Sequence, residues 1–338
     1  MSPLDLPDAT LATYLQAHVP GFEGPLVSTK FQGGQSNPTY RIDAASGTYV
    51  LRRKPPGQLL ASAHAVDREF RVLSALQDSA VPVARPLHLC TDESVIGTIF
   101  YLMAFVDGRI FWDPSLPELG VDDRAATFDA LVGTLACLHR VDVAAVGLAD
   151  YGKPGNYFAR QIARWSEQYR ASQTRKIPAM DALIDKLDAR CPADDGTVSL
   201  THGDYRIDNL MFHPTEPRVI AVVDWELSTL GHPLADLGYF CMALRLPRNP
   251  ALPGLAGLDR AALGIPEEAA MLQRYSELSG RPIPDDWPFV VAFSFFRLAA
   301  IAQGVARRAQ QGNASSEKAV QAGQMTELLA QTGLQTLR

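Results

Sequence analysis

The sequence has few cysteines and no basic excess. Its four cysteines, Cys90, Cys137, Cys191 and Cys241, are scattered over 338 residues, and none forms a C-x-x-C pair. This spacing excludes a zinc cluster or redox dithiol of that type and favours a reducing compartment over a disulfide framework. The net charge is −6, from 31 Lys and Arg against 37 Asp and Glu. Nucleic-acid-binding proteins usually carry a basic excess, so no nucleic-acid partner is expected.

Long hydrophobic runs and targeting signals are also missing. The first ten residues, MSPLDLPDAT, contain neither a basic region nor an apolar core, so we expect no secretory signal. The most apolar stretch, residues 289–302, is interrupted by Arg297 and is too short to cross a bilayer, which predicts a buried helix. With 47% hydrophobic and 20% charged residues, the composition is typical of a globular protein. We therefore expect a cytoplasmic protein without a membrane partner.

The predicted secondary structure changes character near residue 105. Before this point the patterns predict helices at 8–18 and 62–77 and strands at 26–31, 39–43, 48–53, 87–90 and 98–105. After it they predict helices at 122–140, 156–173, 178–190, 234–246, 266–279, 288–310 and 314–331, with short strands at 198–200, 210–212 and 219–223. The prediction is an α+β protein with a small sheet lobe over 1–105 and a larger, mainly helical lobe over 106–338. A cleft between two such lobes is a preferred ligand site.

The clearest chemical signal is H-G-D-Y-R-I-D-N at residues 202–209, followed by V-V-D-W-E at 222–226. Asp204 is followed five residues later by Asn209 and, after an apolar strand, by Asp224. This order suits phosphoryl transfer, in which one Asp accepts a hydroxyl proton while the Asn and the second Asp hold Mg²⁺ against nucleotide phosphates. The apolar flanks of the two motifs predict a hairpin that brings both metal ligands to one end.

Several residues near these motifs allow more than one interpretation. His202 and Asp236 are interpreted as structural support for the motif loop, because the histidine spacing fits no zinc pattern. Glu226 either supports the metal site or faces solvent, and its role stays open. Glu69 could be no more than a solvated helix charge. The pair Gly33 and Gly34 fits neither common phosphate-loop pattern and could form a simple hairpin turn.

Together these motifs resemble the aminoglycoside phosphotransferase family, which has the protein-kinase-like fold. H-G-D-x-x-x-x-N stands where protein kinases have H-R-D-x-x-x-x-N, and D-W-E stands in place of D-F-G. The resemblance covers nearly the whole chain and is closest to the branch that is fused to acyl-CoA dehydrogenases. The runs that carry it are V-L-R-R-K-P-P-G at 50–57, R-E-F-R-V-L at 68–73, G-N-Y-F-A-R-Q-I-A-R-W at 155–165 and F-S-F-F-R-L at 293–298.

The resemblance implies a role for each motif residue. Asp204 would be the catalytic base, Asn209 and Asp224 would bind Mg²⁺, and ATP would supply the phosphoryl group. Glu69 would pair with a cation on the third strand, where Arg52 matches the position that is usually Lys; Lys54, on the same face by alternation, is the alternative. The remaining nucleotide-binding residues would be Gly33, Gly34, Gln35, Ser36 and Asn37 over the phosphates and Met103, Ala104, Phe105 and Val106 at the adenine.

The acceptor is predicted from charge. Aminoglycosides are polycations and require an acidic pocket, whereas the candidate acceptor segments here are basic and apolar. The basic residues are Arg160, Arg164, Arg245 and Arg248. They favour an anionic or acyl acceptor, such as a hydroxy acid or a hydroxyacyl-CoA. The alternative acceptor is an aminoglycoside or other amino alcohol, and the alternative to an enzyme is a nucleotide-binding pseudoenzyme. The arginines could also merely face solvent or pair with neighbouring carboxylates.

Overall fold

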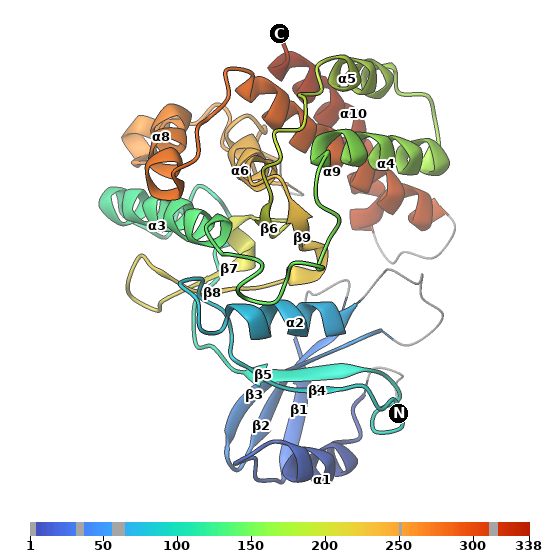
Figure 1. Cartoon of the computed structure of the whole chain (residues 1–338), viewed down its shortest axis with the longest axis vertical. Coiled ribbons are helices and arrows are strands. Elements are labelled where there is room, and N and C mark those ends of the chain that lie inside the picture. The colour runs from blue at the N-terminus through green and yellow to red at the C-terminus, as the bar shows by residue number, and fades with distance from the viewer. Residues whose placement is uncertain (1–4, 32–36, 56–64, 250–251, 311–316) are drawn as a thin grey trace. The chain divides into compact units, whose positions relative to one another are not determined.

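The chain folds into two units in the computed structural model, which describes residues 5–31, 37–55, 65–249, 252–310 and 317–338 (Figure 1). We call the first the sheet unit; it comprises Met1–Arg109, Ala145–Leu148 and Leu210–Ser228. The second, the helical unit, comprises Ile110–Ala144, Ala149–Asn209 and Thr229–Arg338. The chain therefore passes between the units several times, whereas the sequence predicted one boundary near residue 105.

The sheet unit is built on five antiparallel strands in the order β1-β2-β3-β5-β4. Their bounds are Leu26–Lys30 (β1), Thr39–Ala44 (β2), Gly47–Arg53 (β3), Pro86–Cys90 (β4) and Phe100–Ala104 (β5). Alternation along the strands buries Ile42 and Leu51 in a core that also takes Leu11 and Leu15 of helix α1 (Asp8–His18). The register pairs Arg52 of β3 with Tyr101 of β5. This pairing brings the two residues together for the site described below.

Helix α2 (Val66–Leu76) packs against β4 and β5 and buries a carboxylate together with its apolar face. Val66, Val72, Leu73 and Leu76 are at most 2% exposed, and Glu69 on the same face is 1% exposed. Glutamate is rarely buried unless it is paired. The position of Glu69 therefore indicates a partner within the sheet unit.

A late segment of the chain completes the sheet unit. Strand β7 (Leu210–Phe212) pairs with β8 (Val219–Val222) and leads to the 3₁₀ turn η2 (Trp225–Leu227), which contacts α2. The N–H of Val222 donates to the carbonyl of Pro82 at 2.8 Å, and Arg109 and Phe212 exchange two backbone hydrogen bonds. These bonds attach the β7–β8 hairpin to the earlier part of the unit.

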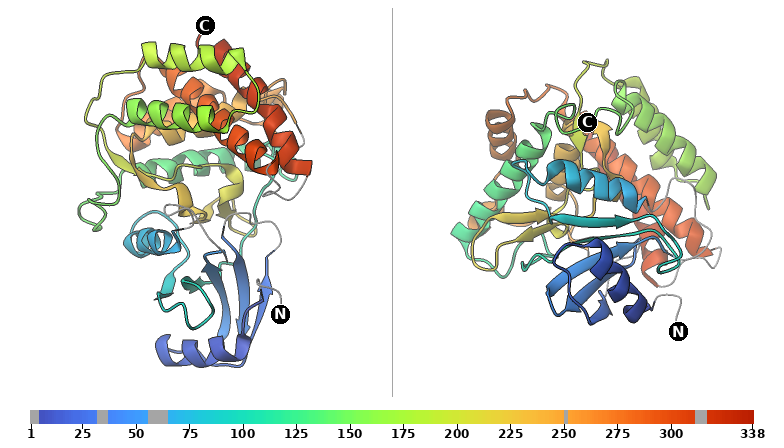
Figure 2. Two further views of the ribbon diagram at one scale, coloured as in Figure 1. Left: turned by 90° about the vertical axis from the view of Figure 1, so that its right-hand side faces the viewer. Right: turned by 60° about the horizontal axis from the view of Figure 1, so that its bottom comes forward.

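The helical unit surrounds a short ribbon in which β6 (Ser199–Thr201) pairs with β9 (Thr229–Gly231). Helices α4 and α5, green in Figure 2, lie against α9 and α10, orange to red. The helices are α3 (Val121–His139), α4 (Tyr157–Ser172), α5 (Pro178–Ala189), α6 (Leu234–Cys241), α7 (Arg260–Leu263), α8 (Glu268–Ser279), α9 (Trp287–Gln310) and α10 (Glu317–Thr336), with 3₁₀ turns η1 (Ile207–Asn209) and η3 (Met242–Leu244). By length and composition alone, helix α9 could cross a membrane, but 72% of its most apolar part is buried inside the protein. It is a core helix, as the sequence predicted.

Most expected elements are present within a few residues of their predicted ends. The helix expected at 234–246 is divided into α6 and η3, and the last helix continues to Thr336. Among the strands and α-helices of the described residues, β9 and the one-turn helix α7 have no counterpart in the prediction, and neither have the 3₁₀ turns η1 and η2. In α7, Asp259 accepts from the N–H of Ala262 at 3.1 Å, and Gly264 ends the turn with φ +74°. Such short elements leave almost no periodic pattern in a sequence.

Candidate active site

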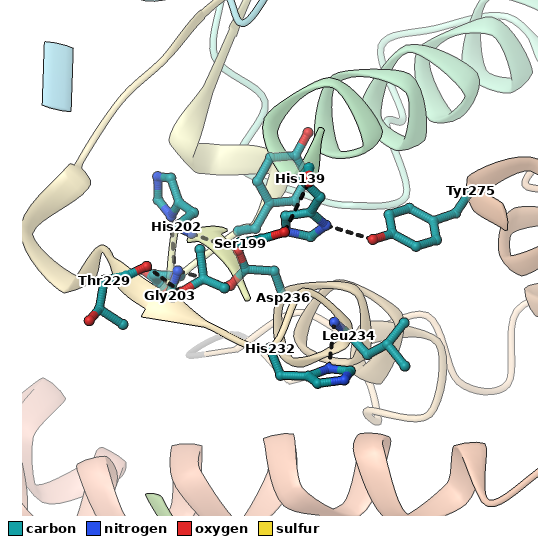
Figure 3. A network of polar contacts seen from close by, with 12 residues as sticks. His139, Ser199, His202, Gly203, Thr229, His232, Leu234, Asp236 and Tyr275 are labelled. Atoms are coloured by element: carbon teal, nitrogen blue, oxygen red, sulfur yellow. Dashed lines mark hydrogen bonds and ion pairs between the residues drawn. The ribbon is translucent and has the colours of Figure 1, made fainter. Parts of the chain in front are cut away.

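The motif loop begins directly after β6, and a buried carboxylate anchors its first two peptide groups. Asp236, in the first turn of α6, is 1% exposed and accepts from the N–H of His202 at 2.6 Å and from that of Gly203 at 2.9 Å (Figure 3). Gly203 has φ +83°, a conformation that favours glycine. Asp236 therefore accepts hydrogen bonds from the two peptide groups with which the loop begins.

A histidine and a tyrosine complete the anchor. The Asp236 carboxylate lies 3.3 Å from Nε2 of His139, whose Nδ1 lies 2.8 Å from the Tyr275 hydroxyl (Figure 3). Burial acts to raise the pKa of Asp236, but its hydrogen bond and charge interaction with His139 outweigh burial, and the pKa is lowered. Burial lowers the pKa of His139. A neutral His139 can donate a hydrogen bond from Nε2 to an ionised Asp236. It can also accept a hydrogen bond from the Tyr275 hydroxyl at Nδ1.

Asp204 and Asn209 lie together in this loop. The Asn209 side-chain N–H₂ donates to the backbone carbonyl of Asp204 at 2.8 Å and to its Oδ2 at 2.9 Å. The Asp204 side chain is 22% exposed and lies close to Tyr239. Burial, followed by the charge of Asp204, raises the pKa of Tyr239, so the phenol keeps its proton. Asp204 is thus oriented by Asn209 and still reachable by a small molecule.

The sheet unit contributes a second polar cluster around the carboxylate of Glu69. Nε of Arg52 lies 2.9 Å from Glu69 Oε2, Asn37 donates to Oε1 at 2.7 Å, and the Tyr101 hydroxyl donates to Oε2 at 3.2 Å. Burial raises the pKa of Glu69, while Arg52 and the two hydrogen bonds oppose that shift. Burial acts to lower the pKa of Arg52, but the neighbouring carboxylates, first of all Glu69, raise it above its usual value. Of the two predicted cations, the structure places Arg52 against Glu69.

Asp224 follows β8 in a left-handed backbone conformation, with φ 65° and ψ 60°. Its Oδ1 accepts from a terminal nitrogen of Arg52 at 2.5 Å, and the Glu226 carboxylate lies 3.7 Å from the same nitrogen. A left-handed non-glycine residue is uncommon and is concentrated at functional sites. Arg52 therefore links Glu69, Asp224 and Glu226, which gives Glu226 a place in the same ionic cluster.

The residues predicted to hold Mg²⁺ fit that ion in their donor chemistry. Asn209 uses its amide nitrogen toward Asp204, so its Oδ1 is left for another partner. Asp224 supplies a carboxylate with a 35% exposed side chain. Mg²⁺ commonly takes one or two protein oxygen ligands and fills its other positions with phosphates and water.

The remaining nucleotide-binding predictions fall partly outside the described residues. Gly33, Gly34, Gln35 and Ser36 lie there. Asn37 is described and bonds Glu69, as given above. Met103 and Ala104 end β5, where the N–H of Ala104 donates to the carbonyl of Arg85 at 2.9 Å, and Phe105 and Val106 follow the strand.

The arginines predicted for the acceptor mostly have partners within the helical unit. Arg245 is ion-paired with Glu268, and Arg248 lies 2.7 Å from Asp113. Arg160 donates to two backbone carbonyls near the start of its helix, at Gly155 and Lys153. The guanidinium of Arg164 lies 5.7 Å from the centre of the Trp165 ring. The alternative of pairing with carboxylates therefore applies to Arg245 and Arg248.

The structure adds residues that the sequence analysis did not select. An apolar cavity in the helical unit is lined by residues 205–208 of the motif loop and by Trp112, Tyr239, Leu244, Leu246 and Leu255, among others. Tyr239 also reaches Asp204, and Arg297 of α9 donates to the carbonyl of Gly203. A signal for Arg297 was available, because it is the one charge within the apolar stretch 289–302.

Comparison with known proteins gives matches over most of the chain. Residues 28–278 match the model of the "Phosphotransferase enzyme family". A crystal structure of a putative aminoglycoside phosphotransferase from Ralstonia eutropha is 49% identical, covers 98% of both chains and superimposes with a TM-score of 0.90. A spectinomycin phosphotransferase solved with ADP and spectinomycin has a TM-score of 0.65 over 97% of this chain and 98% of that one, at 13% identity, and is similar in fold.

Longer relatives are found among acyl-CoA dehydrogenases. Acyl-CoA dehydrogenase family member 10 of Mus musculus is 48% identical over 309 residues, which are 91% of this chain and 29% of the mouse protein. Family member 11 of Homo sapiens is 43% identical over 96% of this chain and 42% of its own length. The chain spans less than half the length of these curated relatives.

Proposed function

Because the chain belongs to the phosphotransferase enzyme family, we propose that it transfers the γ-phosphoryl group of ATP to a hydroxyl group on an acyl or anionic small molecule. The family match and the solved structures confirm the predicted resemblance, the kinase-like two-lobed fold and the assignment as a phosphotransferase. ATP, Mg²⁺ and the acceptor class are parts of the proposal. The spectinomycin phosphotransferase solved with ADP supports the use of a nucleotide. Four free cysteines suit a cytoplasmic location.

The observation that carries the proposal is the arrangement around Asp204. Its carboxylate is partly exposed, its backbone follows two anchored peptide groups, and Asn209 orients its side chain. A carboxylate held in this way can accept a proton from an alcohol. General-base assistance of this kind contributes roughly 10²–10⁴ in rate.

The reaction can be written from these residues. The acceptor oxygen bonds to the γ-phosphorus, the bond from that phosphorus to the ADP oxygen breaks, and the hydroxyl proton passes to Asp204. Asn209 and Asp224 would hold Mg²⁺, which when bound neutralises charge on the phosphates. Arg52, or Lys54 as the alternative, would supply a fixed positive charge to the nucleotide. Gly33–Asn37 and Met103–Val106 remain proposed nucleotide contacts.

An apolar acceptor is favoured by the cavity beside the motif loop. Aromatic and aliphatic side chains form most of its lining, and its two charged residues, Arg206 and Asp208, pair with each other at 2.6 Å. A mainly apolar wall, whose two charged residues pair with each other, suits an acyl chain better than a polycation. We therefore retain a hydroxy acid or hydroxyacyl-CoA as the proposed acceptor. The four predicted arginines would bind this acceptor only if it can replace their present partners; they are Arg160, Arg164, Arg245 and Arg248.

The experiment is transfer of labelled phosphate from ATP, with Mg²⁺, to a panel of 3- and 4-hydroxyacyl-CoAs, free hydroxy acids, sugars, choline and aminoglycosides. Asp204→Asn tests the base, and Asp129→Asn, an exposed aspartate paired with Arg274, is the matched control. Label on a hydroxyacyl compound that requires Asp204 but not Asp129 supports the proposal. Label on an aminoglycoside alone would refute the acyl acceptor. A wild-type protein that transfers to nothing and binds no Mg²⁺–nucleotide would refute the kinase assignment.

A further inference from the structure

A buried arginine, which pairs with no carboxylate of the described residues, contacts the motif loop. Arg297, in the middle of α9, is 4% exposed, although its neighbours along the helix are apolar. Its guanidinium donates to the carbonyl of Gly203 and lies 5.4 Å from the ring centre of Tyr239 and 5.9 Å from that of Trp165. Among the residues that the structure describes, no carboxylate is within ion-pair distance of it.

Such a position is costly for a cation. Removing a guanidinium from water carries a large desolvation penalty, and a well-packed apolar residue in its place is often neutral or stabilising. Here one carbonyl oxygen and two aromatic faces compensate for part of the penalty. Packing of α9 alone would therefore favour an apolar side chain at position 297, as at the flanking Phe296 and Leu298. Packing therefore does not explain the positive charge at this position.

The bond from Arg297 falls on the peptide group next to the proposed base. The Gly203 carbonyl belongs to the peptide that joins Gly203 to Asp204, and the N–H of the same peptide donates to Nδ1 of His202 at 3.2 Å. The two preceding N–H groups are held by Asp236. The backbone that enters Asp204 is thus held by an anion from α6 and a cation from α9.

A second connection runs through Tyr239. This residue lies close enough to Asp204 for the carboxylate to raise the pKa of its phenol, and its ring lies 5.4 Å from the Arg297 guanidinium. The cation therefore contacts both the peptide that carries Asp204 and an aromatic ring beside its side chain. A shift of Arg297 would move both constraints together.

We infer that Arg297 is a positioning residue, which fixes the backbone and the carboxylate orientation of Asp204 through the Gly203 carbonyl and the Tyr239 ring. The consequence for turnover rests on the proposed function. The consequence for the loop itself does not, and it can be measured without an acceptor. The test therefore uses one structural and one kinetic readout on the full chain.

The structural readout is hydrogen exchange at residues 200–209 in wild type and Arg297→Met. The matched control is Arg124→Met, which removes another buried arginine of the helical unit that donates to backbone carbonyls, at Leu116, Leu119 and Leu263. We expect exchange of the loop amides to accelerate by about tenfold or more in Arg297→Met and to stay within about twofold of wild type in Arg124→Met. Equal effects of the two variants on this loop, or no effect of Arg297→Met, would overturn the inference.

The kinetic readout separates kcat from KM. Displacement of a reacting group by about 1 Å costs on the order of 10² in rate, so Arg297→Met should lose about that factor in kcat while KM for ATP changes little. Arg297→Lys, which keeps the charge and one donor, should recover most of the loss. If Arg297→Met does not fold, Arg297→Gln replaces it with both readouts. A folded variant with wild-type kcat overturns the inference, whereas a wild-type enzyme without transferase activity counts against the proposed function alone.

Discussion

Two segments carry the proposed chemistry, and they are held in different ways. The motif loop of the helical unit has its peptide groups bonded to fully buried partners, Asp236 and Arg297. Asp224 of the sheet unit is 35% exposed and bonds Arg52, a residue 172 positions earlier in the chain. Glu69 in turn fixes Arg52 from the core. Backbone hydrogen bonds thus fix the first carboxylate, and the largely buried cation Arg52 holds the second, which is the more exposed member of that pair.

The difference suits the two roles that we propose. A base must stay at one place relative to the hydroxyl, because a small displacement is expensive in rate. A metal ligand must accept a cation and release it during turnover. Arg52, 2.5 Å from Asp224, balances the negative charge of this carboxylate. Another cation can take the place of Arg52 beside it. Changing one residue of each segment tests whether the two carboxylates are held in these different ways.

The largest effect is expected from Asp224→Ala. Mg²⁺-dependent nucleotide turnover should be abolished, because a proposed metal ligand is removed. The free energy of unfolding should change by only about 1 kcal/mol, because Asp224 is partly exposed and Arg52 keeps Glu69 as its buried partner. Turnover and chemical denaturation of the same preparation measure the two effects. Full activity in this variant would refute the assignment of Asp224.

The opposite balance is expected at Asp236. Asp236→Asn should lower the free energy of unfolding by about 3 kcal/mol, because the amide N–H₂ cannot accept a hydrogen bond and leaves a buried donor of the loop or of His139 unpaired. The surface pair of Asp286 with Arg190 provides the control, since Asp286→Asn should cost no more than about 1 kcal/mol. Urea denaturation measures both. Similar losses in the two variants would mean that the motif loop is not anchored as described.

A smaller effect is expected from Arg52→Lys. Lysine keeps the charge but cannot match the planar contacts of arginine with two carboxylates. We expect about a tenfold weaker affinity for Mg²⁺–ATP, or about 1.4 kcal/mol, measured by calorimetry. Lys54→Met is the matched variant. A larger loss from Lys54→Met than from Arg52→Lys would assign the phosphate contact to Lys54.

The smallest effect is a pH dependence of stability from His139. Burial lowers the pKa of His139 in the folded protein, so the unfolded chain takes up a proton first as the pH falls. This contribution to stability is fully present above the unfolded pKa of about 6.5. It is lost as the pH falls from there toward the folded value, by at most about 1.4 kcal/mol per pH unit. His139→Gln should weaken the dependence of the unfolding free energy on pH between pH 7 and 5. The control His213→Gln, at a partly exposed histidine, should leave that dependence unchanged.

The sequence predicted most of the helices and strands, because their periodic patterns are local. The contacts of Tyr239 and Arg297 with the loop could not be predicted in the same way. They join α6 and α9 to residues 203 and 204, and no spacing within the chain records such a contact.

Charge patterns were less informative than polar motifs. The sequence around Arg245 and Arg248 predicts a basic acceptor segment. The partners of these two arginines, Glu268 and Asp113, lie 23 and 135 positions away in the chain. Local net charge does not include distant partners. The buried Glu69 could not be distinguished from a solvated helix charge until its burial and three partners were known.

The repeated passage of the chain between its units limits how the gene can be divided. A fragment that ends near residue 105 would encode all five strands of the main sheet and helix α2. It would lack Leu210–Ser228, which supplies the hairpin bonded to Pro82 and Arg109 and the Asp224 carboxylate paired with Arg52. Such a fragment is not the sheet unit. Truncation, fragment complementation or lobe exchange with a relative would therefore have to transfer both stretches of sequence together.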